Sequence, residues 1–334
     1  MHRSNAAIGS VIMGLVFAAL LAACGSDESP PTESSAAQSA PQLLGAGLPQ
    51  GYTQTQYPIV LVHGFLGFDS VLLFEYFHGI PAALREGGAV VFTPQVSAIN
   101  STEVRGEQLL LEVQKILAVT GKSKVNLIGH SHGGPTVRYV ASVRPDLVAS
   151  VTSVGGVNKG SLVSDIVLGL APAGSMSNTL LVSITEAIGA LISLLSFNPD
   201  LPQDALAAQH SLSTAGAARY NRAFPEGVPT SACGEGDYRV NGVAYFSWSG
   251  TSQYTNVLDP LDPVLTLVGL AFGGEKNDGL VTACSSHLGM VIRDDYAMNH
   301  ADEINQTAGL VNLFETNPVS LYRQHANRLK GLGL

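Results

Sequence analysis

One serine lies between two histidines and two glycines, in the pentapeptide Gly129-His-Ser-His-Gly133. A serine hydroxyl is a weak nucleophile unless a histidine takes its proton and a carboxylate orients that histidine. The chemistry open to Ser131 is therefore attack on a carbonyl carbon, if the fold delivers a base and an acid. Glycine-serine turns also occur without any reactive role, so the surrounding elements must decide between the two interpretations.

Strands and helices alternate through the body of the chain. Short apolar runs over residues 57–63, 124–128 and 148–154 predict strands that are buried on both faces. Residues 101–121 have the spacing of an amphipathic helix, and a second helix is expected over 133–144. This order predicts a parallel sheet with crossover helices.

The pentapeptide falls between the second of these strands and the second helix. That is the position of the nucleophile elbow in the α/β-hydrolase fold, where two glycines let the chain turn sharply and expose the serine. The helix N-terminus beside Ser131 also favours negative charge on a reacting group.

Acid and base follow the serine in this fold, in the order Asp or Glu and then His. The turn Asn277-Asp278-Gly279 offers a carboxylate in a loop, although many such turns have no further role. The histidines after the elbow are His132, His210, His287, His300 and His325. Because His132 is adjacent to Ser131, it is expected to point elsewhere. His325 is expected on the surface of a polar C-terminal helix.

Composition excludes several other classes of protein. Hydrophobic residues make up 46% of the chain and charged residues 13%, which permits a large core and argues against disorder of the bulk. The net charge of −9, with no Lys/Arg block, excludes an electrostatic nucleic-acid binder. The commonest zinc and dinucleotide motifs are missing from the sequence, and no organic cofactor is expected.

The first 24 residues have the features of a secretory signal, because a positive charge precedes an apolar run too short for a comfortable membrane span. Leu21-Ala-Ala-Cys24 resembles a lipobox, in which Cys24 would be lipidated; ordinary cleavage that discards Cys24 is the alternative. We expect a flexible linker over residues 25–51 and the folded domain over residues 52–334. We therefore expect an exported protein, either an outer-membrane lipoprotein or a secreted one.

Three cysteines in an exported chain leave one unpaired. If Cys24 carries lipid, Cys233 and Cys284 remain as a pair, and an oxidising compartment favours a disulfide between them. Two buried free thiols are the alternative.

Four segments together are more specific than the pentapeptide. They cover residues 57–69, 125–135, 277–281 and 284–293. In these segments the chain resembles the Pseudomonas/Burkholderia-type bacterial triacylglycerol lipases, and the similarity extends over about residues 52–330. The resemblance implies an α/β-hydrolase fold, with a mostly parallel central sheet flanked by helices and a helical lid. It also implies hydrolysis of carboxylic ester bonds in long-chain triacylglycerols.

The resemblance further implies roles for individual residues. Ser131 would be the nucleophile, Asp278 the acid and His300 the base. The competing candidate for the base is His287, which lies three residues past Cys284. The backbone N–H groups of Phe65 and His132 would form the oxyanion hole. One structural Ca²⁺ ion would be held by oxygen ligands. The implied calcium ligands are the carboxylates of Asp259 and Asp302 and the backbone carbonyls of Gln306 and Leu310.

Several alternatives stay open at this stage. The apolar stretch over residues 180–197 has helical spacing and is either a core helix or a lid that opens against lipid. A polyester or short-chain esterase would use the same triad, and a surface-binding lipoprotein with an inactive hydrolase fold belongs to another class. Besides the lipid or ester substrate, the resemblance implies a lipase-specific foldase as a partner.

Overall fold

A computed structural model describes residues 51–65, 70–71, 74–170, 177–195 and 201–334. The predicted signal, Cys24 and the linker as far as residue 50 lie outside the described residues. Side chains of residues 188–195 are likewise outside the description.

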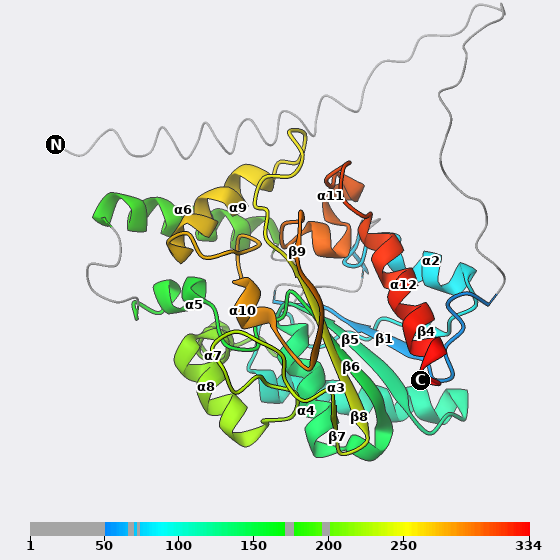
Figure 1. Ribbon diagram of the computed structural model, residues 1–334. Coiled ribbons are helices and arrows are strands. Elements are labelled where there is room, and N and C mark those ends of the chain that lie inside the picture. Colours follow the sequence, from blue (N-terminus) through cyan, green and yellow to red (C-terminus); the bar gives the residue numbers. More distant parts are fainter. Residues whose placement is uncertain (1–50, 66–69, 72–73, 171–176, 196–200) are drawn as a thin grey trace, which may run out of the picture. The chain divides into compact units, whose positions relative to one another are not determined.

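A seven-stranded sheet forms the centre of the described domain (Figure 1). Its strands are β1 Ile59–Val62, β4 Val91–Phe92, β5 Val125–His130, β6 Val148–Val154, β7 Arg239–Val240, β8 Val243–Gly250 and β9 Met290–Tyr296. The order is β4-β1-β5-β6-β8-β7, and β9 pairs with β8. All pairings are parallel except that of β7 with β8. These pairings confirm the prediction of a mostly parallel sheet.

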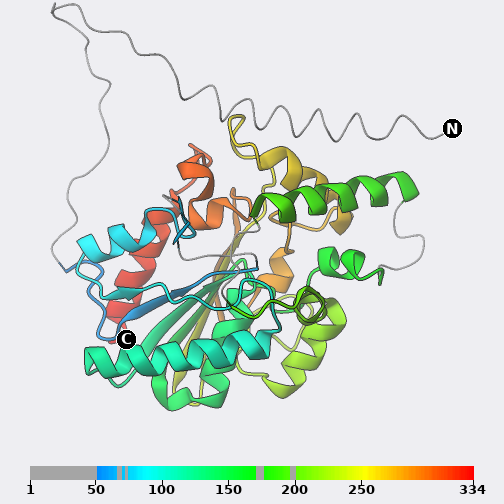
Figure 2. The ribbon, with the colours of Figure 1, turned by 180° about the vertical axis from the view of Figure 1, so that it is seen from behind.

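Helices cover the sheet on both faces (Figures 1 and 2). The longer helices are α2 Ile80–Glu86, α3 Thr102–Thr120, α4 Gly133–Val143, α6 Asn178–Leu195, α7 Ala205–Leu212, α8 Thr214–Ala223, α9 Asp262–Gly269 and α12 Pro318–Gly331. Shorter pieces are α5 Leu162–Val167, α10 Ala283–Ser286, α11 Gln306–Gly309 and the 3₁₀ turns Pro145–Leu147, Leu270–Phe272 and Asp302–Ile304. A separate two-stranded ribbon joins β2 Ser70–Val71 and β3 Phe74–Glu75.

Strand β1 shows how the apolar runs divide between two cores. Ile59 and Leu61 pack with α2 and α12, whereas Val60 and Val62 pack with α3 and α4. Successive side chains of a strand point to opposite faces, so a strand that is covered on both faces must be apolar throughout. This is why the continuous apolar runs predicted the sheet correctly.

The ends of the predicted helices follow from their capping residues. The Ser101 side chain accepts a hydrogen bond from the Val104 N–H and starts α3, and Gly121 ends it with a φ of 65°. Helix α4 begins at Gly133, directly after the pentapeptide, and β6 has the predicted bounds. These predictions are confirmed.

Helix α6 covers most of the apolar stretch for which a lid or a core helix was expected. Ile184 is fully buried against Val268 of α9, whereas Val182 on the same helix is 56% exposed. The described side chains of α6 thus pack on α9 rather than on the central sheet, and the lid stays a prediction. Among the described helices, none is long and apolar enough to cross a membrane.

The surface position expected for His325 is wrong. His325 lies on the face of α12 that packs against the sheet, where only 1% of it is exposed. Its Nε2 is 2.7 Å from the Thr152 hydroxyl of β6, and its ring contacts Trp248 and Phe246 of β8. The polar partner inside the strand satisfies the imidazole, so a histidine can be buried in a helix that is polar on average.

This burial has a measurable consequence. Burial lowers the pKa of His325 well below its usual value, so the unfolded chain binds the proton first as the pH falls below about 6.5. Protonation then destabilises the folded state. We expect the free energy of unfolding to depend less on pH in His325→Asn than in wild type between pH 6.5 and 5, by up to about 1.4 kcal/mol per pH unit at the lower end of this range. Denaturant titrations at each pH measure this, with the exposed His210→Asn as control; equal slopes would contradict the assignment.

Candidate active site

Ser131 lies at the sharp turn between β5 and α4. Its φ of 56° is in the left-handed region, which residues other than glycine rarely adopt. The Ser131 N–H donates to the Val154 carbonyl (3.0 Å), and its own carbonyl accepts from the Gly134 N–H (3.0 Å). The surrounding backbone therefore holds this residue in a strained conformation, as a nucleophile elbow requires.

The two glycines of the pentapeptide make this turn sterically allowed. A Cβ atom on Gly129 would lie 2.1 Å from the Gly133 carbonyl oxygen, and one on Gly133 would lie 2.3 Å from the Val62 carbonyl oxygen. Both distances are far below van der Waals contact, and the obstacle in each case is backbone. The fold therefore needs glycine at both positions.

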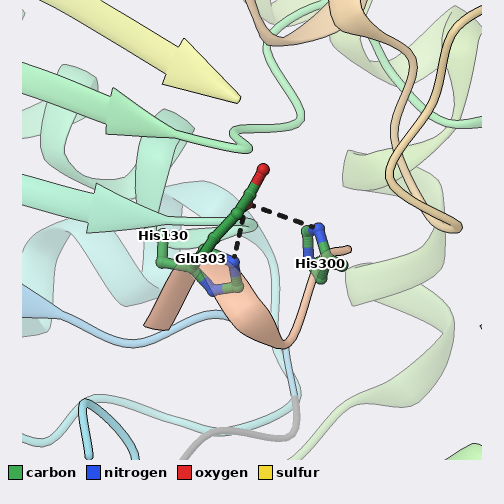
Figure 3. A group of neighbouring side chains, drawn as sticks. All are labelled: His130, His300 and Glu303. Carbon is green, nitrogen blue, oxygen red and sulfur yellow. Dashed lines mark hydrogen bonds and ion pairs between the residues drawn. The ribbon is translucent and has the colours of Figure 1, made fainter. Parts of the chain in front are cut away.

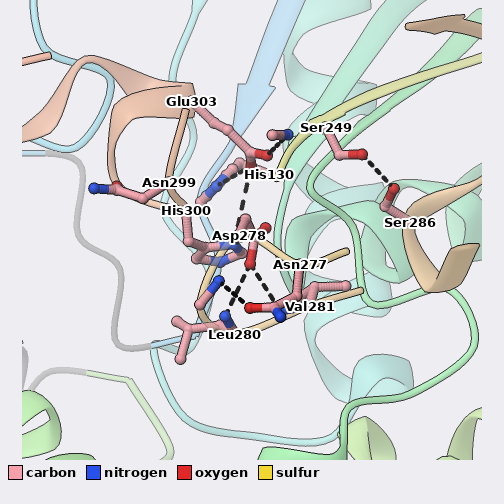
Figure 4. Close-up of polar contacts among 12 residues, drawn as sticks. His130, Ser249, Asn277, Asp278, Leu280, Val281, Ser286, Asn299, His300 and Glu303 are labelled. Carbon is pink, nitrogen blue, oxygen red and sulfur yellow. Dashed lines mark hydrogen bonds and ion pairs between the residues drawn. The ribbon is translucent and has the colours of Figure 1, made fainter. Parts of the chain in front are cut away.

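Asp278 and His300 form the closest acid–base pair near this turn (Figure 4). Asp278 Oδ2 and His300 Nδ1 are 2.8 Å apart, and both residues are buried. The second carboxylate oxygen accepts from the N–H groups of Leu280 (2.8 Å) and Val281 (2.7 Å). The His300 ring lies 4.5 Å, centroid to centroid, from that of His130, the residue before Ser131. The structure thus brings the sequence-predicted acid and base together beside the elbow.

A second buried carboxylate, which the sequence analysis missed, lies beside this pair (Figure 3). Glu303 Oε2 is 3.2 Å from His130 Nε2 and 3.9 Å from His300 Nδ1, and Oε1 accepts from the Gly250 N–H (2.6 Å). Burial and the nearby Asp278 raise the pKa of Glu303 well above its usual value. Burial and His300 lower the pKa of His130. Both shifts favour the neutral forms of the two groups.

The network continues from His130 to the loop after β1. His130 Nδ1 is 2.7 Å from the Tyr76 hydroxyl, which also accepts the Gly64 N–H (3.0 Å). A chain of buried polar contacts therefore joins this loop to His300 through Tyr76, His130 and Glu303. Two imidazoles and a carboxylate within 4.8 Å of one another could also bind a transition metal. Each of these residues already has a protein partner, so the hydrogen-bonded network accounts for the cluster.

The other histidines have different partners. His132 Nε2 is 2.9 Å from the Thr102 hydroxyl, which agrees with the expectation that its side chain points away from the reaction. The competing base His287 contacts Asp294 (3.0 Å) and the Gly234 carbonyl (2.8 Å). It lies beside Cys233, which forms a disulfide with Cys284. The predicted disulfide is confirmed.

A buried guanidinium supports the loop that contains Phe65. Arg105 is fully buried and donates to the carbonyls of His63 (2.6 Å) and Ser97 and to the Thr136 hydroxyl. Burial lowers its pKa to about 9, and the described residues include no carboxylate paired with it. Its positive charge lies next to the loop that is expected to stabilise an anion. Phe65 itself is half-buried and packs with Val157 and Leu212.

The expected calcium ligands Asp259 and Asp302 belong to a cluster of three buried carboxylates with Asp262. Burial, together with a smaller contribution from the negative charge of Asp262, raises the pKa of Asp259 to about 6 and that of Asp302 to about 7. Asp259 Oδ2 and Asp302 Oδ1 make no well-formed hydrogen bond with any described residue. Buried oxygens of this kind fit a cation that takes oxygen ligands.

The other two expected ligands flank an unusual turn. Gln306 and Leu310 bracket Thr307 and Ala308, whose φ values are 56° and 55°. Two consecutive left-handed residues without a glycine are costly, and such strain persists only where the surroundings enforce it. The Thr307 side chain interacts with Asp259, so the turn lies beside the same candidate metal site.

The Glu303 contacts generate a prediction. Glu303→Gln keeps a donor for His130 and an acceptor for Gly250, so it should retain stability and activity within a few-fold of wild type. Glu303→Leu leaves two buried groups unpaired, at a cost of about 1–3 kcal/mol each. Thermal unfolding and ester-hydrolysis kinetics of both variants measure this. If Glu303→Gln loses as much stability and activity as Glu303→Leu, the assignment of Glu303 as a neutral group is wrong.

Comparisons with known proteins agree with the geometry. The family model described as "alpha/beta hydrolase fold" matches residues 57–300. A triacylglycerol lipase from Vibrio cholerae is 64% identical over 285 residues, which cover 85% of this chain and 91% of the relative. A triacylglycerol lipase from Pseudomonas fragi is 46% identical and covers 84% and 98% of the two chains. One from Burkholderia plantarii is 40% identical and covers 85% and 88%.

Solved structures show the same fold at low identity. Lipase 1 from Pelosinus fermentans matches with a TM-score of 0.58 at 16% identity and covers 84% of this chain and all of the other. The chain shares high identity with these lipases along most of its sequence, and it has a mostly parallel sheet with a strained serine at the elbow. It therefore belongs to the bacterial triacylglycerol lipases of the α/β-hydrolase family.

Proposed function

We propose that this chain hydrolyses the carboxylic ester bonds of long-chain triacylglycerols through Ser131, His300 and Asp278. The observation that carries the proposal is the 2.8 Å contact between Asp278 and His300 beside a serine held at a φ of 56°. These are the parts that turn a weak hydroxyl into a nucleophile.

In the first half of the reaction, His300 Nε2 takes the proton of Ser131 as Oγ bonds to the ester carbonyl carbon. Asp278 holds the imidazole through Nδ1 and stabilises its positive charge. The tetrahedral intermediate collapses to an acyl-enzyme, and the alcohol leaves with the proton from His300. In the second half, His300 removes a proton from water as the water oxygen bonds to the acyl carbon. The bond to Ser131 Oγ then breaks, His300 returns the proton to Oγ, and the fatty acid leaves.

The oxyanion is stabilised by the backbone N–H groups of Phe65 and His132. His132 is the first residue after the nucleophile, and the loop of Phe65 is braced by Arg105 and Tyr76. Donation through the backbone does not depend on the Phe65 side chain, which instead shapes the acyl pocket. A lost donor of this type typically reduces kcat by about 100- to 1,000-fold.

Helix α6 supports a lipid substrate over a dissolved one. It packs on α9 through Ile184 and exposes Val182, and an amphipathic helix of this kind would present apolar surface to lipid if it opens as a lid. A polyester or short-chain carboxylesterase with the same triad is the second candidate, and the substrate comparison below separates the two.

We also propose that Asp259 and Asp302 bind one Ca²⁺ ion together with the backbone carbonyls of Gln306 and Leu310. The support is the pair of buried carboxylate oxygens without well-formed partners. The ion would supply the positive charge that lets these carboxylates stay ionised. Since Asp302 lies two residues after His300, the site would fix the loop that holds the base.

Export is part of the proposal, as a lipoprotein anchored through Cys24 or as a secreted enzyme. The Cys233–Cys284 disulfide supports an oxidising compartment. A lipase-specific foldase as folding partner remains a prediction from the family resemblance.

Substitution of the triad tests the mechanism. Ser131→Ala and His300→Ala should each lower kcat by at least about 1,000-fold, because a triad acts as a unit. His287→Asn is the matched control, and it should stay within about tenfold of wild type. Hydrolysis of emulsified long-chain triglyceride and of a dissolved short-chain ester is measured for each variant.

The same assays separate the candidate functions. Hydrolysis of long-chain triglyceride that disappears in Ser131→Ala supports the lipase. Activity confined to the short ester favours the alternative esterase, and solid polyester becomes the next substrate. A fully active Ser131→Ala variant would contradict the mechanism.

Removal of calcium tests the metal site. A chelator should lower the Tm of the wild type by about 5 °C, given about 2.7 kcal/mol of stabilisation at an ion concentration 100 times Kd. Asp259→Asn should have a lower Tm that no longer responds to the chelator. Asp146→Asn, which removes an exposed carboxylate, should respond like wild type. If the chelator lowers the Tm of Asp259→Asn by as much as that of wild type, this site is ruled out.

A further inference from the structure

Four large apolar side chains are strongly exposed on two neighbouring loops. Val257 is 79% and Leu258 72% exposed in the loop between β8 and α9, and Leu313 is 84% and Phe314 99% exposed after α11. We refer to these four residues as the apolar patch. Single exposed apolar residues are common, but two adjacent pairs at such exposure need an explanation.

The two loops are fixed against each other by hydrogen bonds. Asn256 Nδ2 donates to the Val311 carbonyl (3.1 Å), and Asn256 Oδ1 accepts from the Leu258 N–H (3.1 Å). Asn312 repeats this arrangement, because its Oδ1 accepts from the Phe314 N–H (2.9 Å) and its Nδ2 donates to the Ala297 carbonyl (3.2 Å). The apolar side chains are therefore presented on an ordered backbone.

The patch belongs to the part of the molecule that holds the reacting groups. Val257 and Leu258 directly precede Asp259, and Ala297 lies three residues before His300. In both ribbon views the loop before α9 and the segment α11 lie on the same side of the sheet as α6 (Figures 1 and 2).

We infer that the apolar patch is a fixed docking surface for the oil–water interface of the substrate, separate from the lid helix α6. The inference rests on the proposed function, because long-chain triacylglycerols are insoluble and must be met at an interface. Burial of exposed leucine and phenylalanine side chains in oil removes apolar surface from water and favours adsorption. Since the two loops also hold the proposed calcium ligands, adsorption would bring this end of the molecule to the lipid, and the opening of α6 would be a separate step.

The test separates adsorption from chemistry. Leu313→Gln/Phe314→Gln removes half of the patch, and Val257→Gln removes a third member. The matched control is Leu111→Gln/Val119→Gln on α3, whose residues are 58% and 76% exposed and which lies away from α6 and α11 in both views. Each variant of the full chain is mixed with triolein droplets, and the bound fraction is measured by flotation. The rate on a dissolved short-chain ester is measured in parallel.

We expect Leu313→Gln/Phe314→Gln to adsorb at least about tenfold more weakly, Val257→Gln to lose a smaller factor, and the control to adsorb like wild type. The rate on the dissolved ester should be unchanged in all of them. Wild-type adsorption by the patch variants, or equal losses in patch and control, would overturn the inference.

Two further outcomes distinguish a failure of this inference from a failure of the proposed function. If the wild type is a dimer in solution that Leu313→Gln/Phe314→Gln dissociates, the patch is a contact between two copies of the chain and the inference is wrong. If neither ester is hydrolysed by wild type, the proposed function fails. Patch-dependent adsorption would still support the docking surface in that case, so the two failures remain distinct.

Discussion

The site depends on a steric constraint: there is no room for a side chain where the sharp turn at Ser131 meets β1 and the residues that follow it. Gly129 and Gly133 face backbone atoms at 2.1 and 2.3 Å from where their Cβ atoms would lie, and Gly64 would meet the Ser131 Cβ at 2.7 Å. Only chains without Cβ atoms at these positions can bring the serine, the start of α4 and the loop after β1 so close together. The strained φ of Ser131 is a consequence of this packing.

Close backbone approach also buries polar groups, and the molecule satisfies most of them with one another. The Tyr76, His130 and Glu303 side chains connect the loop after β1 to His300, and Arg105 donates a hydrogen bond to the His63 carbonyl of the same loop. In a medium of low polarity such contacts are stronger than in water, and an unmade contact is more costly. The position of His300 is therefore set by several contacts besides its bond to Asp278.

Much of the fold could be predicted because its signals are local. Continuous apolar strands, the Ser101 cap and the Gly121 stop are each determined within a few residues. The pairing of Asp278 with His300 came from family resemblance, since a turn aspartate has no distinguishing pattern of its own. Glu303 and Asp262 were missed, because nothing in the sequence tells a buried carboxylate from an exposed one. His325 was misplaced for the same reason: its partner Thr152 lies 173 residues away along the chain.

The disulfide divides the residues of the proposed triad and of the proposed calcium site between two parts of the chain. Cys233 and Cys284 are 51 residues apart, and the covalent ring that they close contains β8, Asp259 and Asp278. His300 and Asp302 lie outside the ring, in a C-terminal segment that is held only by packing and polar contacts. Both the acid–base pair and the carboxylate pair therefore form across this boundary. Detachment of the C-terminal segment would separate both pairs at once while the ring stayed closed, so the proposed triad and the proposed calcium site would be lost in one step.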